Sequence, residues 1–75
     1  MNTKYTNLKN ITIGDFVKPL LVSPQNIKVE IVASDGFVFT KKKALRNLLK
    51  LEAYMVFKTV EVIQSEKTTM LKFEL

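Results

Sequence analysis

The sequence predicts a small α+β domain of two layers. We expect one four-stranded, mostly antiparallel sheet of two hairpins, with two helices on one face, in the order α-β-β-α-β-β. Two observations lead to this prediction. Short runs in which apolar and polar residues alternate flank two turn signals, as in β-hairpins. A capped segment precedes the first hairpin, and a segment with helical spacing of its leucines precedes the second.

The length and composition allow one small domain. The chain has 75 residues, near the lower limit for a hydrophobic core that is stable without disulfides or metals. Hydrophobic residues make up 47% of the chain, which is enough to build such a core. We expect a flexible N-terminal segment over residues 1–10, because this stretch is polar, and a single domain over residues 11–75.

The first helix is expected to begin at Ile13. Thr12 and Asp15 have the spacing of a capping box, with aspartate in place of the usual glutamate or glutamine. Pro19 then removes a backbone donor and crowds the preceding turn. The sequence therefore predicts a short or kinked helix that extends only to about Lys18.

The first hairpin follows a loop expected over residues 23–26. Residues 27–33 alternate between apolar and polar side chains, as a half-buried strand does. Ser34-Asp35-Gly36 is a turn signal, and Phe37-Val38-Phe39 begins the second strand. The sequence therefore predicts a hairpin with its turn at Asp35 and Gly36.

The register of this hairpin depends on the length of the turn. A two-residue turn leaves Phe37 and Phe39 on the face away from the core, as an exposed interaction surface. A three-residue turn, with Gly36 in the left-handed conformation, pairs Ala33 with Phe37. It also pairs Ile31 with Phe39, so that both rings join the core face. We expect the three-residue turn, because burial of two aromatic rings contributes several kcal/mol.

The densest positive charge lies in the segment Thr40–Lys50, which we expect to form the second helix. Helical spacing places three leucines and Glu52 on one side: Leu45, Leu48, Leu49 and Glu52. Three lysines fall in the expected first turn, where the helix dipole favours anions. The candidate site for phosphate or acidic groups is therefore Lys41, Lys42, Lys43, Arg46 and Lys50. The alternative is that these residues form only a solvated outer face.

A second hairpin is expected over the final third of the chain. Strands over residues 60–64 and 69–75 flank a turn at residues 65–68. Centring the turn on residues 66 and 67 produces three matched pairs: Val62 with Leu71, Val60 with Phe73, and Glu61 with Lys72. We expect residues 69–75 to form a sheet edge that is open to a strand from a second copy or from a partner.

The composition argues against catalysis and metal binding. The chain has no cysteine and no histidine, so a catalytic site would need paired carboxylates or a lysine in a cleft. Nothing in the sequence gathers such a pair. The sequence also has no calcium-binding loop and no glycine-rich phosphate loop. We therefore expect no enzymatic activity, no cofactor, no metal and no small-molecule substrate.

Membrane association is not expected. No run approaches the ~20 apolar residues that span a bilayer. The N-terminal residues lack the apolar stretch of a signal peptide. The expected location is therefore cytoplasmic.

The charge balance indicates the class of partner. Twelve basic residues exceed seven acids and give a net charge of +5, which favours nucleic acid or acidic proteins. Aromatic stacking with single strands is not indicated, because the expected register places Phe37 and Phe39 in the core. The sequence therefore predicts a binding protein that contacts nucleic acid or an acidic protein through a basic helix. The alternative is a protein–protein interaction module or a homodimer formed through a sheet edge.

Three hydrophobic patterns carry a resemblance to a known group. They are Ile11-Thr12-Ile13-Gly14-Asp15-Phe16, then Ile27-x-Val29-x-Ile31 leading to Asp35-Gly36, and Val60-x-Val62 with a closing Leu71-x-Phe73-x-Leu75. Over residues 11–75 the chain resembles short uncharacterised proteins of phages and mobile elements in low-GC Gram-positive bacteria. It differs from that group in its lysine run, where the group is often acidic. The resemblance implies an accessory or regulatory role that works by binding.

Overall fold

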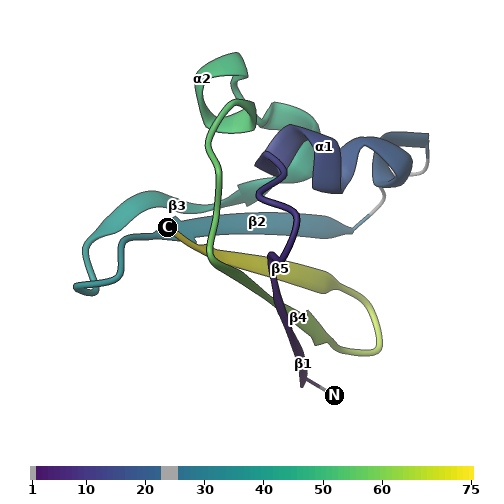
Figure 1. Ribbon diagram of the computed structural model, residues 1–75. Helices are drawn as coiled ribbons and strands as arrows, with labels where there is room; N and C mark the ends of the chain where they lie inside the picture. The colour runs from purple at the N-terminus through teal and green to yellow at the C-terminus, as the bar shows by residue number, and fades with distance from the viewer. Residues whose placement is uncertain (1, 23–25) are drawn as a thin grey trace.

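The computed structural model describes residues 2–22 and 26–75. They form a five-stranded mixed sheet with short helices on one side (Figure 1). The elements are β1 (Asn2–Thr6), α1 (Ile13–Val17), the 3-10 helix η1 (Lys18–Val22), β2 (Ile27–Val32), β3 (Val38–Ala44), the 3-10 helix η2 (Leu45–Asn47), α2 (Lys50–Ala53), β4 (Thr59–Gln64) and β5 (Thr69–Glu74). The strand order is β1-β4-β5-β2-β3, in which β2 and β5 are parallel and the other neighbours are antiparallel. The loop expected over residues 23–26 lies, except for Asn26, outside the described residues.

The predicted four-stranded sheet in the order α-β-β-α-β-β is therefore wrong. The segment expected to be flexible contains a fifth strand, β1, which pairs with β4 from Asn2–Ile63 to Thr6–Thr59. The sequence of β1, NTKYT, has no apolar alternation that would predict a strand, and all five residues are exposed. The helix expected over residues 40–50 is also absent, because this segment comprises most of β3, then η2 and the start of α2.

The beginning of α1 agrees with the sequence. The Thr12 hydroxyl accepts a hydrogen bond from the Asp15 amide at 3.1 Å and so caps the helix. The α-helix ends at Val17, and the chain continues as the 3-10 helix η1, which contains Pro19. The prediction of a short helix is confirmed. Pro19 explains why the helix is short, because a proline cannot donate a backbone hydrogen bond.

The second hairpin has the predicted register but a different place in the sheet. The three expected pairs are present: Val62 with Leu71, Val60 with Phe73, and Glu61 with Lys72. However, β5 also pairs in parallel with β2, from Ile27–Thr69 to Val32–Glu74, and lies inside the sheet. The predicted free edge at residues 69–75 is therefore wrong, and the edges of the sheet are β1 and β3.

The first hairpin has the predicted turn but not the predicted register. The turn glycine has φ of +94°, and the Ala33 amide donates to the Phe37 carbonyl at 2.7 Å, as a three-residue turn requires. Further along, Ile31 lies opposite Thr40 instead of Phe39, because a β-bulge inserts an extra residue into β3. The expected burial of both phenylalanines is therefore wrong, since Phe37 is 64% exposed and Phe39 is 45% exposed.

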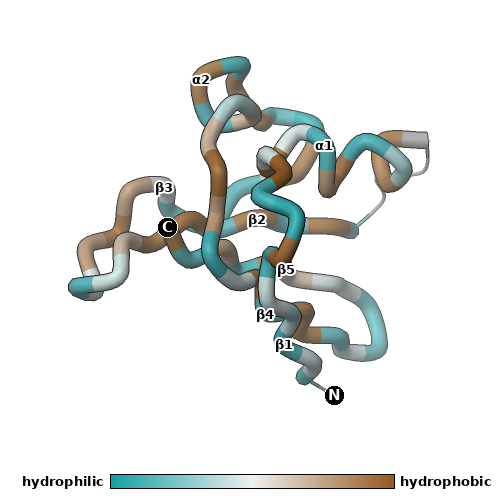
Figure 2. Tube along the Cα trace, in the orientation of Figure 1, coloured by the Kyte–Doolittle hydropathy of each residue, from teal (hydrophilic) through white to brown (hydrophobic). Residues whose placement is uncertain are grey.

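The core lies between the helices and one face of the sheet, where apolar stretches of β2 and α1 face each other (Figure 2). Its buried apolar members are Ile13, Val17, Val29, Ile31, Leu45, Phe57, Val60, Leu71 and Phe73. Phe57 and Phe73 meet edge to face with ring centroids 5.0 Å apart, and Phe16 lies 5.7 Å from each. A Cβ at Gly14 would lie 3.0 Å from the Ala53 carbonyl oxygen, so the glycine permits α1 and α2 to touch.

Candidate functional site

The net positive charge of the chain is concentrated in one segment. Residues 36–51 contain five basic residues and no acid, while the other seven basic residues equal the seven acids in number. The structure places this segment at one edge of the sheet, along β3, η2 and the start of α2. Four of its cations are exposed, and we refer to them as the basic edge: Lys41, Lys42, Arg46 and Lys50.

Backbone pairing explains why the lysine run lies in a strand. The inner strand β2 pairs with β5 on one side and with β3 on the other, so a helix over residues 40–44 would leave part of β2 unpaired. Lysines are compatible with this position because β3 is an edge strand, where charged side chains are common. The anion pocket expected at the N-terminus of a basic helix is therefore wrong, because Lys41–Lys43 lie in a strand.

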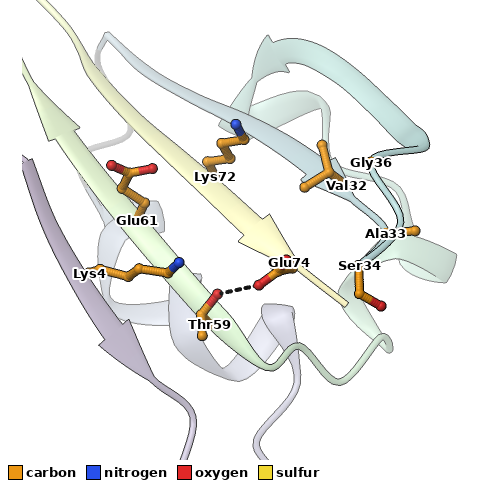
Figure 3. Close-up of a pocket in the computed structure, with 9 residues that line it drawn as sticks. All are labelled: Lys4, Val32, Ala33, Ser34, Gly36, Thr59, Glu61, Lys72 and Glu74. Atoms are coloured by element: carbon orange, nitrogen blue, oxygen red, sulfur yellow. Dashed lines mark hydrogen bonds between the residues drawn. The ribbon is translucent and has the colours of Figure 1, made fainter.

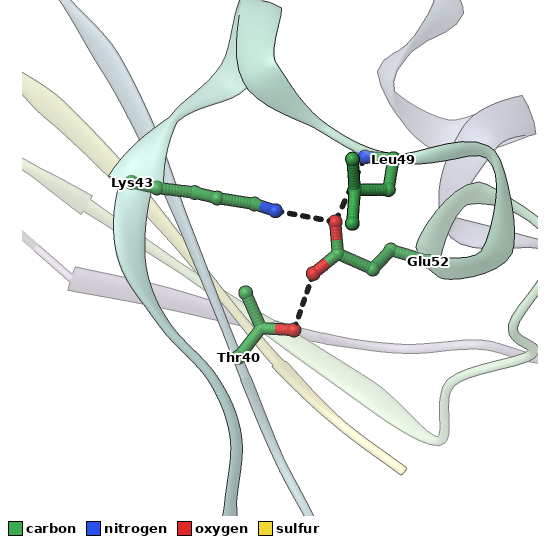
Figure 4. A network of polar contacts seen from close by, with 4 residues as sticks. All are labelled: Thr40, Lys43, Leu49 and Glu52. Carbon is green, nitrogen blue, oxygen red and sulfur yellow. Dashed lines mark hydrogen bonds and ion pairs between the residues drawn. The ribbon is translucent and has the colours of Figure 1, made fainter.

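The fifth cation, Lys43, belongs to a buried network (Figure 4). Its Nζ atom lies 2.6 Å from Oε1 of Glu52, and the Thr40 hydroxyl donates to Oε2 of Glu52 at 2.5 Å. The Leu49 amide donates to Oε1 at 2.8 Å, so Glu52 also caps the first turn of α2. The network thus ties β3 to α2 and neutralises Lys43 within the fold.

The hydrogen bonds of this network control the ionisation of Glu52. Burial of the carboxylate raises its pKa, but hydrogen bonds from Lys43, Thr40 and the Leu49 amide, together with the charge of Lys43, outweigh burial and lower the pKa below its ordinary value of 4.5. Because the pKa is lower in the folded state, ionised Glu52 stabilises the fold at pH values above its unfolded pKa. This stabilisation is lost as the pH falls through the folded pKa.

We expect Glu52→Gln to remove the part of the pH dependence of stability that comes from ionised Glu52. The difference in free energy of unfolding between wild type and variant should be largest at pH values above the unfolded pKa of Glu52. It should shrink as the pH falls through the lowered folded pKa, because protonated Glu52 is also neutral. Urea unfolding across this pH range measures the difference. Glu66→Gln, in the exposed turn between β4 and β5, is the matched control, because it removes one carboxylate outside the network. A difference for Glu52→Gln that stays constant with pH would contradict the pKa direction.

The leucines expected to share one buried helix face are separated in the structure. Leu45 is buried in η2, Leu48 is half-buried, and Leu49 is exposed. Exposed aromatic rings instead flank the basic edge in the sequence: Phe37 and Phe39 precede it and Tyr54 follows it. The sequence analysis missed this grouping because it assigned both phenylalanines to the core. The only sequence signal for it was the two-residue alternative for the turn, which also exposes both rings.

A pocket lies on the uncovered face of the sheet (Figure 3). This pocket of about 250 Å³ is lined by two lysines and two glutamates, Lys4, Lys72, Glu61 and Glu74, and by residues of the first turn. The Thr59 hydroxyl donates to Glu74 at 3.2 Å. Equal numbers of opposite charges give the pocket no preference for anions. Among the described residues, no group of three or more acidic side chains could hold a metal ion.

Comparisons with protein-family models, curated proteins and solved structures found no match for this chain. None of the helices in residues 2–22 and 26–75 has the length and hydrophobicity needed to cross a membrane. Inference about function therefore rests on the charge, exposure and contacts of the residues described above.

Proposed function

We propose that this chain is a non-enzymatic binding protein that contacts nucleic acid phosphates through the basic edge. The observation that supports this proposal is that residues 36–51 carry a charge equal to the whole net charge, with four of their five cations exposed. These cations follow one another in the chain: Lys41 and Lys42 lie in β3, Arg46 in η2 and Lys50 at the start of α2. Several exposed cations in succession suit a chain of phosphates better than a single anion. Accessory binding is also the role that the resemblance to phage and mobile-element proteins implies.

Pairing through a sheet edge is less well supported. β3 carries Lys41 and Lys42 and is interrupted by two irregularities in its register with β2. Both features oppose the addition of another strand. The strand that the sequence suggested for pairing, β5, lies inside the sheet. We therefore favour phosphate binding over a homodimer or a strand-docking module.

The double variant Lys41→Gln/Lys42→Gln tests this proposal. We expect it to weaken binding to a fluorescein-labelled DNA about tenfold at low salt and to reduce the slope of log affinity against log salt by roughly two, because each lysine contributes one phosphate contact. Fluorescence anisotropy across a salt series measures both quantities. Both side chains are exposed, so the fold should be retained.

Lys18→Gln/Lys67→Gln is the matched control. It removes the same charge from exposed positions outside the basic edge and should retain most of the affinity. Equal losses in the two double variants would show that net charge, not the basic edge, controls binding. Binding to polyglutamate but not to DNA would identify an acidic protein as the partner and overturn the proposal.

A further inference from the structure

Two phenylalanines lie exposed at the start of the strand that carries the lysines: Phe37 immediately precedes β3, and Phe39 lies in it. Phe37 is 64% exposed and Phe39 is 45% exposed, and Val38 between them is also exposed. The edge-to-face ring cluster of the core is formed by other phenylalanines. Adjacent apolar side chains left in solvent are typical of an interaction surface, because their burial would otherwise stabilise the fold.

The Glu52 network explains why Phe39 lies outside the core. The bulge in β3 places Thr40 opposite Ile31 on the core side, where the Thr40 hydroxyl reaches Glu52. A phenylalanine at this register position could not make that hydrogen bond. The polar contact that fixes β3 to α2 therefore excludes Phe39 from the core.

The backbone beneath the first ring is also held in place. The Phe37 amide donates to Oδ1 of Asp35 at 3.0 Å, and its carbonyl accepts from the Ala33 amide at 2.7 Å. The ring of Phe37 is thus presented from an ordered turn. A ring in such a position loses little backbone freedom when a ligand stacks on it.

One ring and two of the cations follow one another along β3: Phe39, Lys41 and Lys42. Phe39 precedes Lys41 by two residues, which corresponds to about 7 Å along a strand. At the axial rise of a stacked strand, about 3.4 Å per nucleotide, this distance corresponds to about two nucleotides. Bases on the rings and phosphates on the lysines could therefore belong to one stretch of the same strand.

From these observations we infer that the partner is single-stranded nucleic acid, with bases stacked on Phe37 and Phe39 and phosphates on the basic edge. This inference rests on the proposed function and makes its ligand more specific. Stacking on aromatic rings needs an accessible base face, which a duplex hides and a single strand offers. Charge complementarity with the basic edge argues for an anionic strand over an apolar protein surface.

The test compares three labelled ligands of about 12 nucleotides, a length within the range of small single-strand binding domains. They are a mixed-sequence single strand, the matching duplex, and an abasic strand that keeps the phosphates. We expect the protein to bind the single strand at least about tenfold more tightly than the abasic strand. Phe37→Leu/Phe39→Leu should lose this preference while still binding the abasic strand. Lys41→Gln/Lys42→Gln should weaken binding to both strands.

Tyr5→Leu is the matched control, because Tyr5 is an exposed ring on the opposite sheet edge, β1, and its loss should keep the preference. Thermal unfolding verifies that each variant is folded. If the preference is absent, or survives Phe37→Leu/Phe39→Leu, the stacking inference is wrong while the phosphate-binding proposal stands. If no nucleic acid binds, both are wrong.

Discussion

Replacing Phe73 with alanine is expected to remove about 3–5 kcal/mol from the free energy of unfolding. The side chain is fully buried, and its ring lies edge to face with Phe57 and Phe16 at centroid distances of 5.0 and 5.7 Å. Truncation loses the transfer free energy of the ring and leaves a cavity. Phe16 and Phe57 come from other segments and could fill this cavity only in part. A domain of this size has a total stability of about 4–11 kcal/mol, so the expected loss is a large fraction of the total.

Urea unfolding followed by circular dichroism measures this effect. Phe37→Ala is the matched control, because it deletes the same ring from an exposed position and should change stability by less than about 0.5 kcal/mol. Phe73→Leu keeps most of the volume and should cost about 1.5 kcal/mol, so it remains informative if the alanine variant does not fold. A loss below about 1 kcal/mol for Phe73→Ala would contradict the burial of this ring.

The features of the fold that were predicted correctly each depend on only a few neighbouring residues. The register of β4 and β5 follows from a four-residue turn and from apolar and charged pairs that agree, such as Val60 with Phe73 and Glu61 with Lys72. The cap of α1 follows from Thr12 and Asp15 alone. The positive φ of the turn glycine follows from its place in a short loop. Each of these features is local, so one short pattern is sufficient to predict it.

Most of the errors involve contacts between segments that are separated in the sequence. β1 has no apolar alternation and becomes a strand only by pairing with β4, whose residues follow more than fifty positions later in the chain. Residues 40–50 contain good helix formers, but pairing with β2 overrides that propensity over residues 40–44. No local pattern shows that Thr40 and Lys43 will meet Glu52.

The charge of the candidate site could be predicted from the sequence, but the arrangement of its side chains could not. The concentration of cations over residues 41–50 is visible in the sequence, whatever structure the segment adopts. Which side chains share a face depends on whether the segment is a helix or a strand. For this reason the sequence grouped Lys43 with Arg46, whereas the structure pairs Lys43 with Glu52 and leaves Phe37 and Phe39 exposed just before the other cations in the chain.

Glu52→Ala is expected to lower the free energy of unfolding by about 2–3 kcal/mol. The substitution leaves the buried Thr40 hydroxyl and the Leu49 amide without their acceptor and leaves the Lys43 ammonium without its counter-charge. The Lys43 side chain is 25% exposed, so water compensates part of this loss, and the effect should fall below the value for a fully buried pair. Loss of the cap on α2 contributes about 1 kcal/mol of the total.

A double-mutant cycle with Lys43→Ala separates the ion pair from the other contacts. If Lys43 and Glu52 interact as the structure shows, the double variant should be more stable than the sum of the single losses implies, by at least about 1 kcal/mol. Glu66→Ala, in an exposed turn, should have almost no effect. Hydrogen exchange of the β3 amides should accelerate in Glu52→Ala, because the network joins this edge strand to α2. Strictly additive losses, with unchanged exchange in β3, would show that Glu52 does not hold the strand on which the basic edge and its exposed rings depend.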